Sequence, residues 1–277
     1  MALTVNTNLF SLNTQRALMS SENDLKVSMA RLSSGLRINS AKDDAAGLYT
    51  VEKMTADIRG QSQAIRNAAD GMSLSQVAEG AIGQIANNLQ RIREIAVQSA
   101  NGTVEDRTGL QKEVDQLTQE ISRIVNTTRF NGTALLSASS NLTFQVGEDG
   151  AADNQVSVST VVLTGLSSYS GTLSATGVVN VSTQAAASAA IGSMETDIGT
   201  VSSNRATFGA VQNRFEAVIA NLSVSVENVS AARSRVQDAD FAAETARLTR
   251  AQILQQAGVA MLAQANTVPQ TALALLR

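Results

Sequence analysis

The side chains that could carry metal or acid–base chemistry in this sequence are carboxylates. Five of them gather in two places, which are Asp43 with Asp44 and Glu148, Asp149 and Asp153. Oxygen ligands of this kind suit Ca²⁺, although helix capping and turn solvation explain the same residues without an ion. The chain has no His and no Cys, which excludes nearly all zinc, copper and haem sites and the usual catalytic pairs. We therefore expect no catalytic residues, no metal, no cofactor and no enzyme activity.

The composition of the chain limits the kinds of partner that it can bind. The chain has 277 residues, a formal net charge of −3 and 43% hydrophobic residues, enough to bury a sizeable core. There is no basic footprint for nucleic acid and no polybasic patch for a membrane surface. The first residues lack the cationic and apolar regions of a secretory signal, and no apolar run is long enough to span a bilayer. Taken alone, these features favour a soluble cytosolic protein.

The elements that must position any site are helices, and the strongest periodic pattern lies in the last third of the chain. Fourteen positions from 191 to 236 follow alternating steps of three and four, and eleven of them carry large apolar residues: Ile191, Met194, Ile198, Val201, Phe208, Phe215, Ile219, Leu222, Val226, Val229 and Val236. This pattern predicts one long helix packed in coiled-coil style. Arg205 and Arg233 interrupt it, either to fix the register or with packed stems and solvated heads.

Two further stripes precede it. One runs through Ile82, Ile85, Leu89, Ile92 and Ala96, and the other through Leu110, Val114, Leu117, Ile121 and Ile124. The Asn101-Gly102 break between them predicts an antiparallel helical hairpin. With the late helix this makes a bundle of long helices.

The middle of the chain has a different pattern. Leu142, Phe144 and Val146 alternate with polar residues, a turn follows at residues 147–150, and Val156 and Val158 alternate again, which predicts a β-hairpin. Residues 166–180 have no clear period and are expected to form loop or short strand. The Ser/Thr-rich part of that segment, residues 167–176, is a candidate for O-linked glycans. The predicted fold class is mainly α, a long antiparallel helical bundle or coiled coil with a small β-hairpin region.

Both ends of the chain carry thinner apolar stripes, flanked by Ser, Asn, Gln and Ala. Their members are Leu18, Leu25, Met29, Leu32, Leu36, Phe241, Leu248, Leu254, Val259 and Leu262. An isolated pair of such helices buries too little apolar surface to offset its ordering entropy. We expect both ends to be disordered in a monomer and helical only in an assembly. The Ser40-x-x-Asp43 sequence resembles a capping box, which marks a linker before the bundle.

Several segments resemble bacterial flagellin. They are Val5-Asn-Thr-Asn8, Arg31-Leu-Ser-Ser-Gly-Leu-Arg-Ile-Asn39, Asp43-Asp-Ala-Ala-Gly47, Ala64-Ile-Arg-Asn-Ala-Ala-Asp-Gly71, residues 88–101, Gly209-Ala-Val-Gln-Asn-Arg214, Ile253-Leu-Gln-Gln-Ala-Gly258, Leu262-Ala-Gln-Ala-Asn266 and Val268-Pro-Gln270. Each motif is modestly specific, but their joint order is highly specific. The resemblance covers roughly residues 1–147 and 183–277.

The resemblance implies an architecture of discontinuous domains formed by both chain ends. Residues 1–42 and 238–277 would form an inner terminal coiled-coil domain. Residues 43–184 and 185–237 would form an outer helical bundle with a β-hairpin and no large variable insert.

The function implied is that of a subunit that self-assembles into the flagellar filament. It would be exported unfolded through the flagellar secretion channel without a cleaved signal, which replaces the cytosolic interpretation with an extracellular one. The implied partners are further copies of the chain, the export apparatus, a flagellin chaperone on the C-terminal segment, and hook-associated junction and cap proteins. The alternative is a hook–filament junction protein.

The resemblance also implies a contact surface for an innate immune Toll-like receptor and for other subunits. Carried over to this chain, it comprises Leu89, Gln90, Arg91, Glu94, Ile95 and Glu113. An Arg-centred polar helix face suits bidentate hydrogen bonding. The alternative for the same residues is an ordinary solvated helix face.

Overall fold

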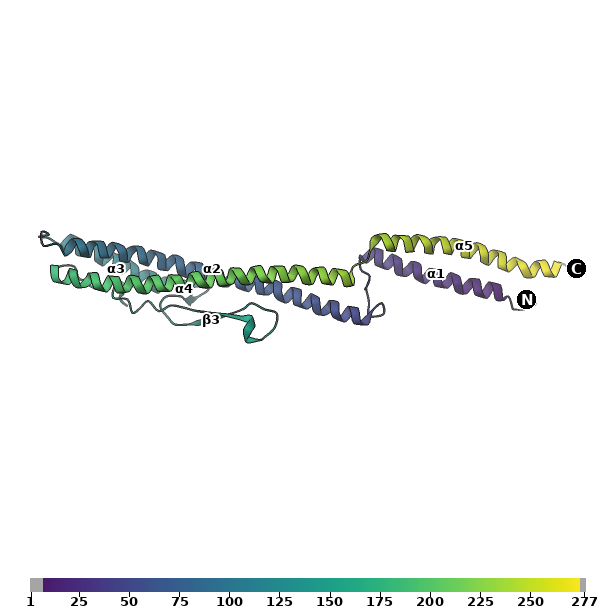
Figure 1. Cartoon of the computed structure of the whole chain (residues 1–277), viewed down its shortest axis with the longest axis horizontal. Helices are drawn as coiled ribbons and strands as arrows, with labels where there is room; N and C mark the ends of the chain where they lie inside the picture. The colour runs from purple at the N-terminus through teal and green to yellow at the C-terminus, as the bar shows by residue number, and fades with distance from the viewer. Residues whose placement is uncertain (1–6, 275–277) are drawn as a thin grey trace. The chain divides into compact units, whose positions relative to one another are not determined.

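A computed structural model describes the backbone of residues 7–274 and the side chains of residues 7–267 (Figure 1). Its helices are α1 (Leu9–Ser34), α2 (Ala45–Ser99), α3 (Thr108–Thr127), α4 (Gln184–Gln237) and α5 (Phe241–Ala274). Between α3 and α4 lie the strands β1 (Arg129–Phe130), β2 (Thr133–Ala134), β3 (Asn141–Gln145) and β4 (Gln155–Ser159), with a 3₁₀ turn at Ala152–Asn154. The predicted mainly α class is confirmed. Within residues 7–274, no helix has the length and hydropathy needed to cross a bilayer.

The chain forms two compact units. Unit 1 comprises residues 1–56 and 227–277, and unit 2 comprises residues 57–226. Unit 1 therefore joins two segments far apart in the sequence, unit 2 is one continuous segment, and the divisions fall inside α2 and α4. The boundaries expected from the resemblance, at residues 42/43 and 237/238, lie instead in the connections beside these helices. That assignment concerns the assembled protein and stays a prediction.

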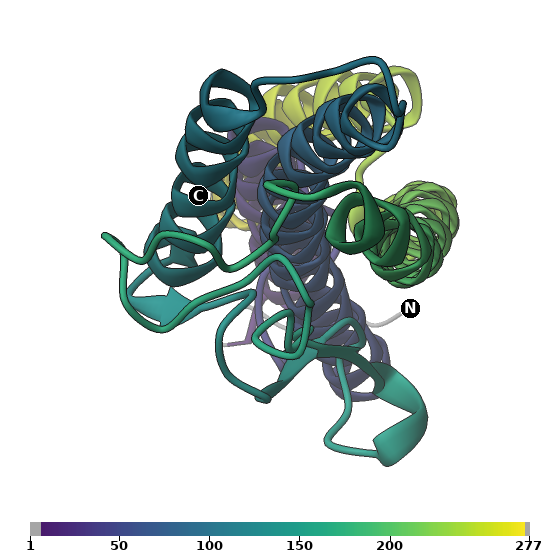
Figure 2. The ribbon, with the colours of Figure 1, turned by 90° about the vertical axis from the view of Figure 1, so that its left-hand side faces the viewer.

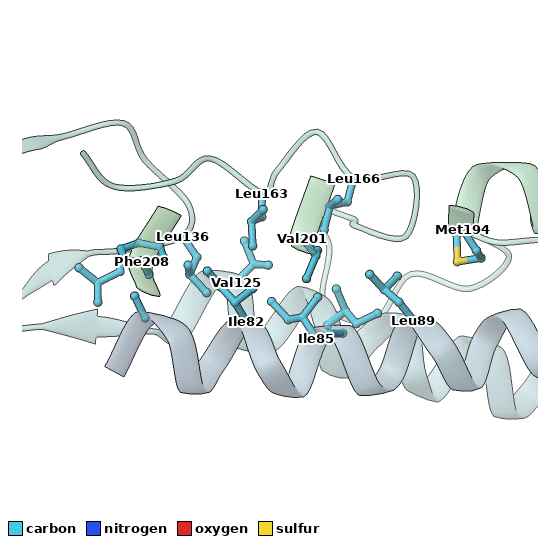
Figure 3. Packing of buried hydrophobic residues seen from close by; sticks show 14 of the residues in the cluster. Ile82, Ile85, Leu89, Val125, Leu136, Leu163, Leu166, Met194, Val201 and Phe208 are labelled. Atoms are coloured by element: carbon cyan, nitrogen blue, oxygen red, sulfur yellow. The ribbon is translucent and has the colours of Figure 1, made fainter. Parts of the chain in front are cut away.

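The core of unit 2 lies where α2, α3 and α4 face one another (Figure 3). The predicted stripes point into it: Ile82, Ile85, Leu89, Ile92 and Ala96 of α2 have no exposed surface, and neither do Val114 and Ile121 of α3. From α4 come Met194, Val201, Phe208 and Phe215. The chain reverses between Ser99 and Thr108, as the Asn-Gly break predicts. Large apolar residues at steps of three and four thus build this core.

Phe215 of α4 packs against both the β3–β4 hairpin and α2. Its ring packs edge-on against Phe144 of β3, with centroids 5.6 Å apart and planes at 86°, the arrangement that aromatic rings prefer. On its other side lies Gly71 of α2, where an added Cβ would come within 2.4 Å of the Phe215 ring. Glycine at position 71 therefore makes room for the ring.

The predicted hairpin is confirmed. β3 and β4 pair antiparallel with Leu142 opposite Val158 and Phe144 opposite Val156, so the alternating apolar residues share the face turned to the core. A second, two-residue pair joins β1 to β2. Its turn is Asn131-Gly132, both with positive φ (46° and 82°), as a type I′ turn requires. This turn was not predicted.

The segment after β4 is irregular, as predicted, yet it is firmly held. Figure 2 looks along the helices and shows the irregular chain and the hairpin on one side of α2, α3 and α4. Leu163, Leu166, Val179 and Val181 are buried in the core. These residues form no sheet ladder. The N–H groups of Leu163 and Leu166 bond to backbone carbonyls, and the side chains of Gln111 and Ser99 bond to backbone groups of Val179 and Val181.

Two buried carboxylates make further attachments to this segment. Asp197 of α4, 3% exposed, accepts from the backbone N–H groups of Ser167 and Ser168 and from the Ser168 hydroxyl, each at 3.0 Å. Asp115 of α3 accepts from the N–H of Gly177 at 2.9 Å. Neither residue stood out in the sequence.

Replacing Asp197 by Ala should lower the free energy of unfolding of unit 2 by about 2–3 kcal/mol, since it removes the acceptor of three hydrogen bonds, two of them from buried Ser168. Urea denaturation followed by circular dichroism measures the loss. Glu195→Ala, at an exposed position of the same helix, is the control and should change little. An unchanged urea midpoint for Asp197→Ala would show that the hydrogen bonds to Asp197 do not stabilise unit 2.

In unit 1 the chain that follows α1 contacts the chain that follows α4. α1 ends because Gly35 takes the left-handed conformation (φ 73°) and its N–H bonds to the Arg31 carbonyl at 2.8 Å, a common helix stop. Leu36 therefore does not continue the helical stripe, and the expectation that it does is wrong. It forms an isolated bridge with Asp238, while the N–H of Arg37 bonds to the Gln237 carbonyl at 2.6 Å.

The predicted capping box closes a single turn before α2. The Asp43 carboxylate accepts from the N–H groups of Asn39 and Ser40 and from the Ser40 hydroxyl. These hydrogen bonds, with those from Ser40 first, hold the pKa of Asp43 below its ordinary value. The helix itself is capped by the next residue, because the Asp44 carboxylate accepts from the N–H of Gly47 at 2.8 Å. The acidic pair thus has a structural role that needs no metal ion.

Candidate functional site

The terminal helices α1 and α5 pack side by side and antiparallel (Figure 1). Asn8 at the start of α1 donates to the Ala265 carbonyl at 2.8 Å, and Arg31 near its end lies 3.9 Å from Glu244 of α5. The residues buried along this seam are Ser11, Ser21 and Ser28 on α1 and Ala251, Ala265 and Glu244 on α5, so that all but Glu244 are small. At Gly258 an added Cβ would lie 3.2 Å from the Leu18 side chain. Small residues let the two backbones approach closely, but they bury little apolar area.

The large apolar residues of these helices mostly face outward. We call the exposed ones the terminal apolar surface: Leu9, Phe10, Leu12, Met19, Val27 and Met29 on α1, and Phe241, Ile253, Leu254, Val259 and Met261 on α5, with exposed fractions from 43% to 67%. They are eleven of the seventeen large apolar side chains that are exposed in the described part of the chain. This concentration marks α1 and α5 as an interaction surface.

The predicted assembly residues divide between the seam and this surface. Leu18, Leu25, Leu32, Leu248 and Leu262 are half-buried where α1 and α5 meet. Met29, Phe241, Leu254 and Val259 belong to the terminal apolar surface. The other exposed residues were missed because they fall outside the heptad stripes. The expected disorder of both ends in a free monomer stays a prediction, and the motif at Val268-Pro-Gln270 lies outside the residues whose side chains are described.

The predicted receptor surface is centred on Arg91 in unit 2. Its guanidinium bonds to Glu113 of α3 at 2.8 Å and to Glu94 one turn along α2 at 3.0 Å. These hydrogen bonds, with that to Glu113 first, raise the pKa of Arg91 above its ordinary value. Gln90, Arg91, Glu94 and Glu113 are exposed. The two ion pairs bring Arg91, Glu94 and Glu113 together, and Gln90 lies one helical turn before Glu94 on α2.

Leu89 and Ile95 do not belong to that face. Both have no exposed surface and lie in the core of unit 2, because the helical period turns them toward α3 and α4. Their assignment to the contact surface is corrected accordingly. They anchor α2, the helix that carries Arg91, in the core of unit 2.

The two arginines that interrupt the late seam find partners within the chain. Arg205 bonds to Glu79 of α2 at 2.8 Å, with about half of its side chain exposed, and Arg233 lies 3.5 Å from the Thr55 hydroxyl. Neither contact needs a second subunit. Among the described residues, no three His, Cys, Asp or Glu side chains are grouped to hold a metal ion.

Comparison with protein families and known proteins identifies the fold and the motifs. The model of the bacterial flagellin N-terminal helical region matches residues 5–141, and that of the C-terminal helical region matches residues 191–276. The flagellins of Halalkalibacterium halodurans and Bacillus subtilis are 43% and 42% identical, and the alignments cover 99% of each chain. The flagellar filament 33 kDa core protein of Treponema phagedenis is 40% identical with the same coverage.

Comparison with solved structures also finds flagellar proteins. The crystal structure of Bacillus cereus flagellin is 29% identical with a TM-score of 0.50, and the match covers 61% of this chain and 94% of that one. A putative flagellar hook-associated protein from Vibrio parahaemolyticus has a TM-score of 0.60 at 15% identity, covering 71% and 100%. The latter likeness is one of fold alone and does not favour a junction protein. The chain belongs to the bacterial flagellins, the structural subunits of the flagellar filament.

Proposed function

We propose that this flagellin polymerises by burying the terminal apolar surface of α1 and α5 against neighbouring copies. The observation that carries the proposal is the concentration of eleven exposed large apolar side chains on a helix pair whose seam fully buries small residues and Glu244 and leaves its leucines only half-buried. Complete burial of one such side chain contributes roughly 1.5–3 kcal/mol. Burying half of the exposed area would contribute on the order of 10 kcal/mol, enough to offset much of the cost of association.

Because α1 and α5 bury little apolar surface against each other, we also expect them to be only marginally stable before assembly. A seam of small residues offsets little of the entropy lost on ordering some sixty residues, so α1 and α5 open readily in the free chain. In the filament, neighbours supply the missing contacts and the helices become stable by mass action. Unit 2, with its large apolar core, is folded in both states.

Hydrogen exchange tests this proposal. Backbone amides of α1 and α5 should exchange quickly in the purified free chain and at least ~100-fold more slowly in filaments, since local opening then requires loss of the subunit contacts. Amides in the unit 2 core should be protected in both states. Terminal helices that are equally protected in the dilute free chain would contradict the proposal. Electron microscopy of the same sample separates long filaments from the short assemblies expected of a junction protein.

We further propose the location and partners that accompany this role. The chain leaves the cell unfolded through the flagellar secretion channel, and a chaperone covers the C-terminal segment until export. Exposed Ile253, Leu254 and Val259 on α5 give such a chaperone an apolar surface to bind. Hook-associated junction and cap proteins would contact the ends of the filament through the same helices.

We also propose that the Arg91 face of unit 2, with Gln90, Glu94 and Glu113, is the part of the monomer that an innate immune Toll-like receptor contacts. The supporting observation is an exposed guanidinium already oriented by two carboxylates. Such a preoriented Arg loses little entropy on binding.

Arg91→Ala should weaken receptor activation by the monomer about tenfold or more, as expected for a central interface Arg. A reporter-cell dose–response curve measures the change. Arg123→Ala is the matched control, because Arg123 is also exposed and forms an i,i+3 pair, with Glu120 at 2.6 Å. Equal loss in both variants, or none in Arg91→Ala, would remove Arg91 from the contact surface.

A further inference from the structure

The methionines of this chain differ sharply in exposure. On the terminal helices, Met19 and Met29 of α1 and Met261 of α5 are 67%, 57% and 62% exposed. In the core of unit 2, Met194 of α4 has no exposed surface, and the two methionines of α2 are partly buried. Among the methionines of residues 7–267, the exposed thioethers therefore all belong to the terminal apolar surface.

The composition of the chain makes these thioethers its first target for a peroxide. The chain has no Cys and no Trp, so methionine sulfur is the side-chain atom that hydrogen peroxide oxidises most readily. A sulfur lone pair attacks one peroxide oxygen, an S–O bond forms as the O–O bond breaks, and the proton on the attacked oxygen leaves with the other oxygen as water. Sulfur loses two electrons and the peroxide gains them. The reaction needs no metal ion and no catalytic residue, only access to the sulfur.

The product does not suit an apolar contact. Met19 follows Leu12 by seven residues and Met261 follows Leu254 by seven, so each methionine shares an exposed helix face with a leucine. A thioether packs against such neighbours as a soft apolar group. A sulfoxide is polar, and its oxygen is a strong hydrogen-bond acceptor that loses its water on burial without gaining a donor from apolar side chains.

We propose that Met19, Met29 and Met261 are a reversible oxidation site, at which hydrogen peroxide converts the free chain into a form that filaments do not incorporate. This inference rests on the proposed polymerisation through α1 and α5 and adds a regulation to it. The three sulfurs are open to peroxide before assembly and covered by neighbouring subunits afterwards. Oxidation therefore stops the addition of new subunits and spares the filament that already exists.

Mass spectrometry of peroxide-treated protein tests access to the three sulfurs. In the free chain each should oxidise at least ~10-fold faster than Met194, which serves as the internal reference. In filaments each should oxidise at least ~10-fold more slowly than in the free chain. If all three react equally in both states, the inference is overturned while the proposed function stands. Failure of the untreated chain to polymerise would instead refute the proposed function.

Assembly of the oxidised chain tests the consequence. Its critical concentration for filament growth should be at least ~10-fold higher than that of the untreated chain. Methionine sulfoxide reductases A and B, which together accept both sulfoxide epimers, should restore the original value. A smaller increase, or one that the two reductases do not reverse, overturns the inference without the need for any variant.

Substitution tests which sulfurs are responsible. Leucine keeps nearly the volume of methionine and has no sulfur, so a chain with Met19→Leu, Met29→Leu and Met261→Leu should show nearly the same critical concentration before and after peroxide. Each protein is its own reference in this ratio. The matched control carries Met54→Leu and Met72→Leu in α2, outside the terminal apolar surface, and should keep the full increase. An increase that persists in the triple variant assigns the effect to other residues and refutes the site.

Discussion

Ile253→Asp should abolish filament growth. Ile253 is 60% exposed on α5 and belongs to the terminal apolar surface, so the proposed assembly buries it against a neighbouring subunit. A carboxylate carried into that contact without a partner costs several kcal/mol. At roughly 1.4 kcal/mol per factor of ten, the critical concentration rises by at least about 100-fold. Sedimentation of protein seeded with filament fragments measures it.

The control is another exposed apolar residue changed in the same way. Leu173, in the irregular segment of unit 2, is 48% exposed, and Leu173→Asp should assemble normally. Circular dichroism of both free variants should match the unmodified chain, since each position already faces water. Normal growth of Ile253→Asp filaments would exclude this part of α5 from the subunit contact.

Phe215→Ala should destabilise unit 2 by about 3–5 kcal/mol, the range for removing a buried aromatic ring. The change leaves a cavity beside Gly71 and removes the edge-on contact with Phe144. Chemical denaturation followed by circular dichroism gives the loss. Phe241→Ala, at a position 57% exposed, should cost the free chain less than about 0.5 kcal/mol.

The same contact can be tested from its other side. Gly71→Ala adds a methyl group where the Phe215 ring lies, and overpacking of this kind costs about 1–3 kcal/mol. At Gly83, in the same helix, an added Cβ meets nothing within 4 Å. Gly83→Ala should therefore stabilise the helix by roughly 0.5–1 kcal/mol. If both glycine variants are stabilised equally, the packing of Phe215 against Gly71 is looser than the structure indicates.

The core of unit 2 could be predicted from sequence because its residues are large, apolar and regularly spaced. Met194, Val201, Phe208 and Phe215 follow one helical period, and Leu142 with Phe144 follows the strand period. A period of that kind persists in the fold, because the same side chains must face the same neighbours along a whole element. The long helices, their reversal and the hairpin follow from it.

The attachments of the irregular segment could not be predicted in this way. Asp197 accepts from backbone groups about thirty residues away. Every residue except proline has a backbone N–H, so the sequence does not show which of these groups bonds to Asp197. Asn131-Gly132, by contrast, is a recognisable turn signal that went unused. Leu89 and Ile95 were placed on a surface because a family motif was carried over whole, although the helical stripe already assigned Leu89 to the core.

The terminal helices and the leucines of their seam were predicted, but the small residues buried in that seam were not. Ser, Ala and Gly carry no hydrophobic period, so the contact line through Ser21 and Ala251 is invisible in the sequence. The end of α1 at Gly35 was missed because the leucine spacing continues past it to Leu36. Burial of Glu244 depends on how closely the two backbones approach, which the pattern of residue types does not specify.

The way the irregular segment is held has a practical consequence. Its fixed points are separate: Asp197 holds Ser167 and Ser168, Asp115 holds Gly177, and residues 171–174 between them are exposed. A foreign peptide spliced into that interval would lengthen a surface loop and leave the hydrogen bonds to Asp197 and Asp115 in place, at a modest entropic penalty. Each filament would then display one copy of the foreign peptide on every subunit.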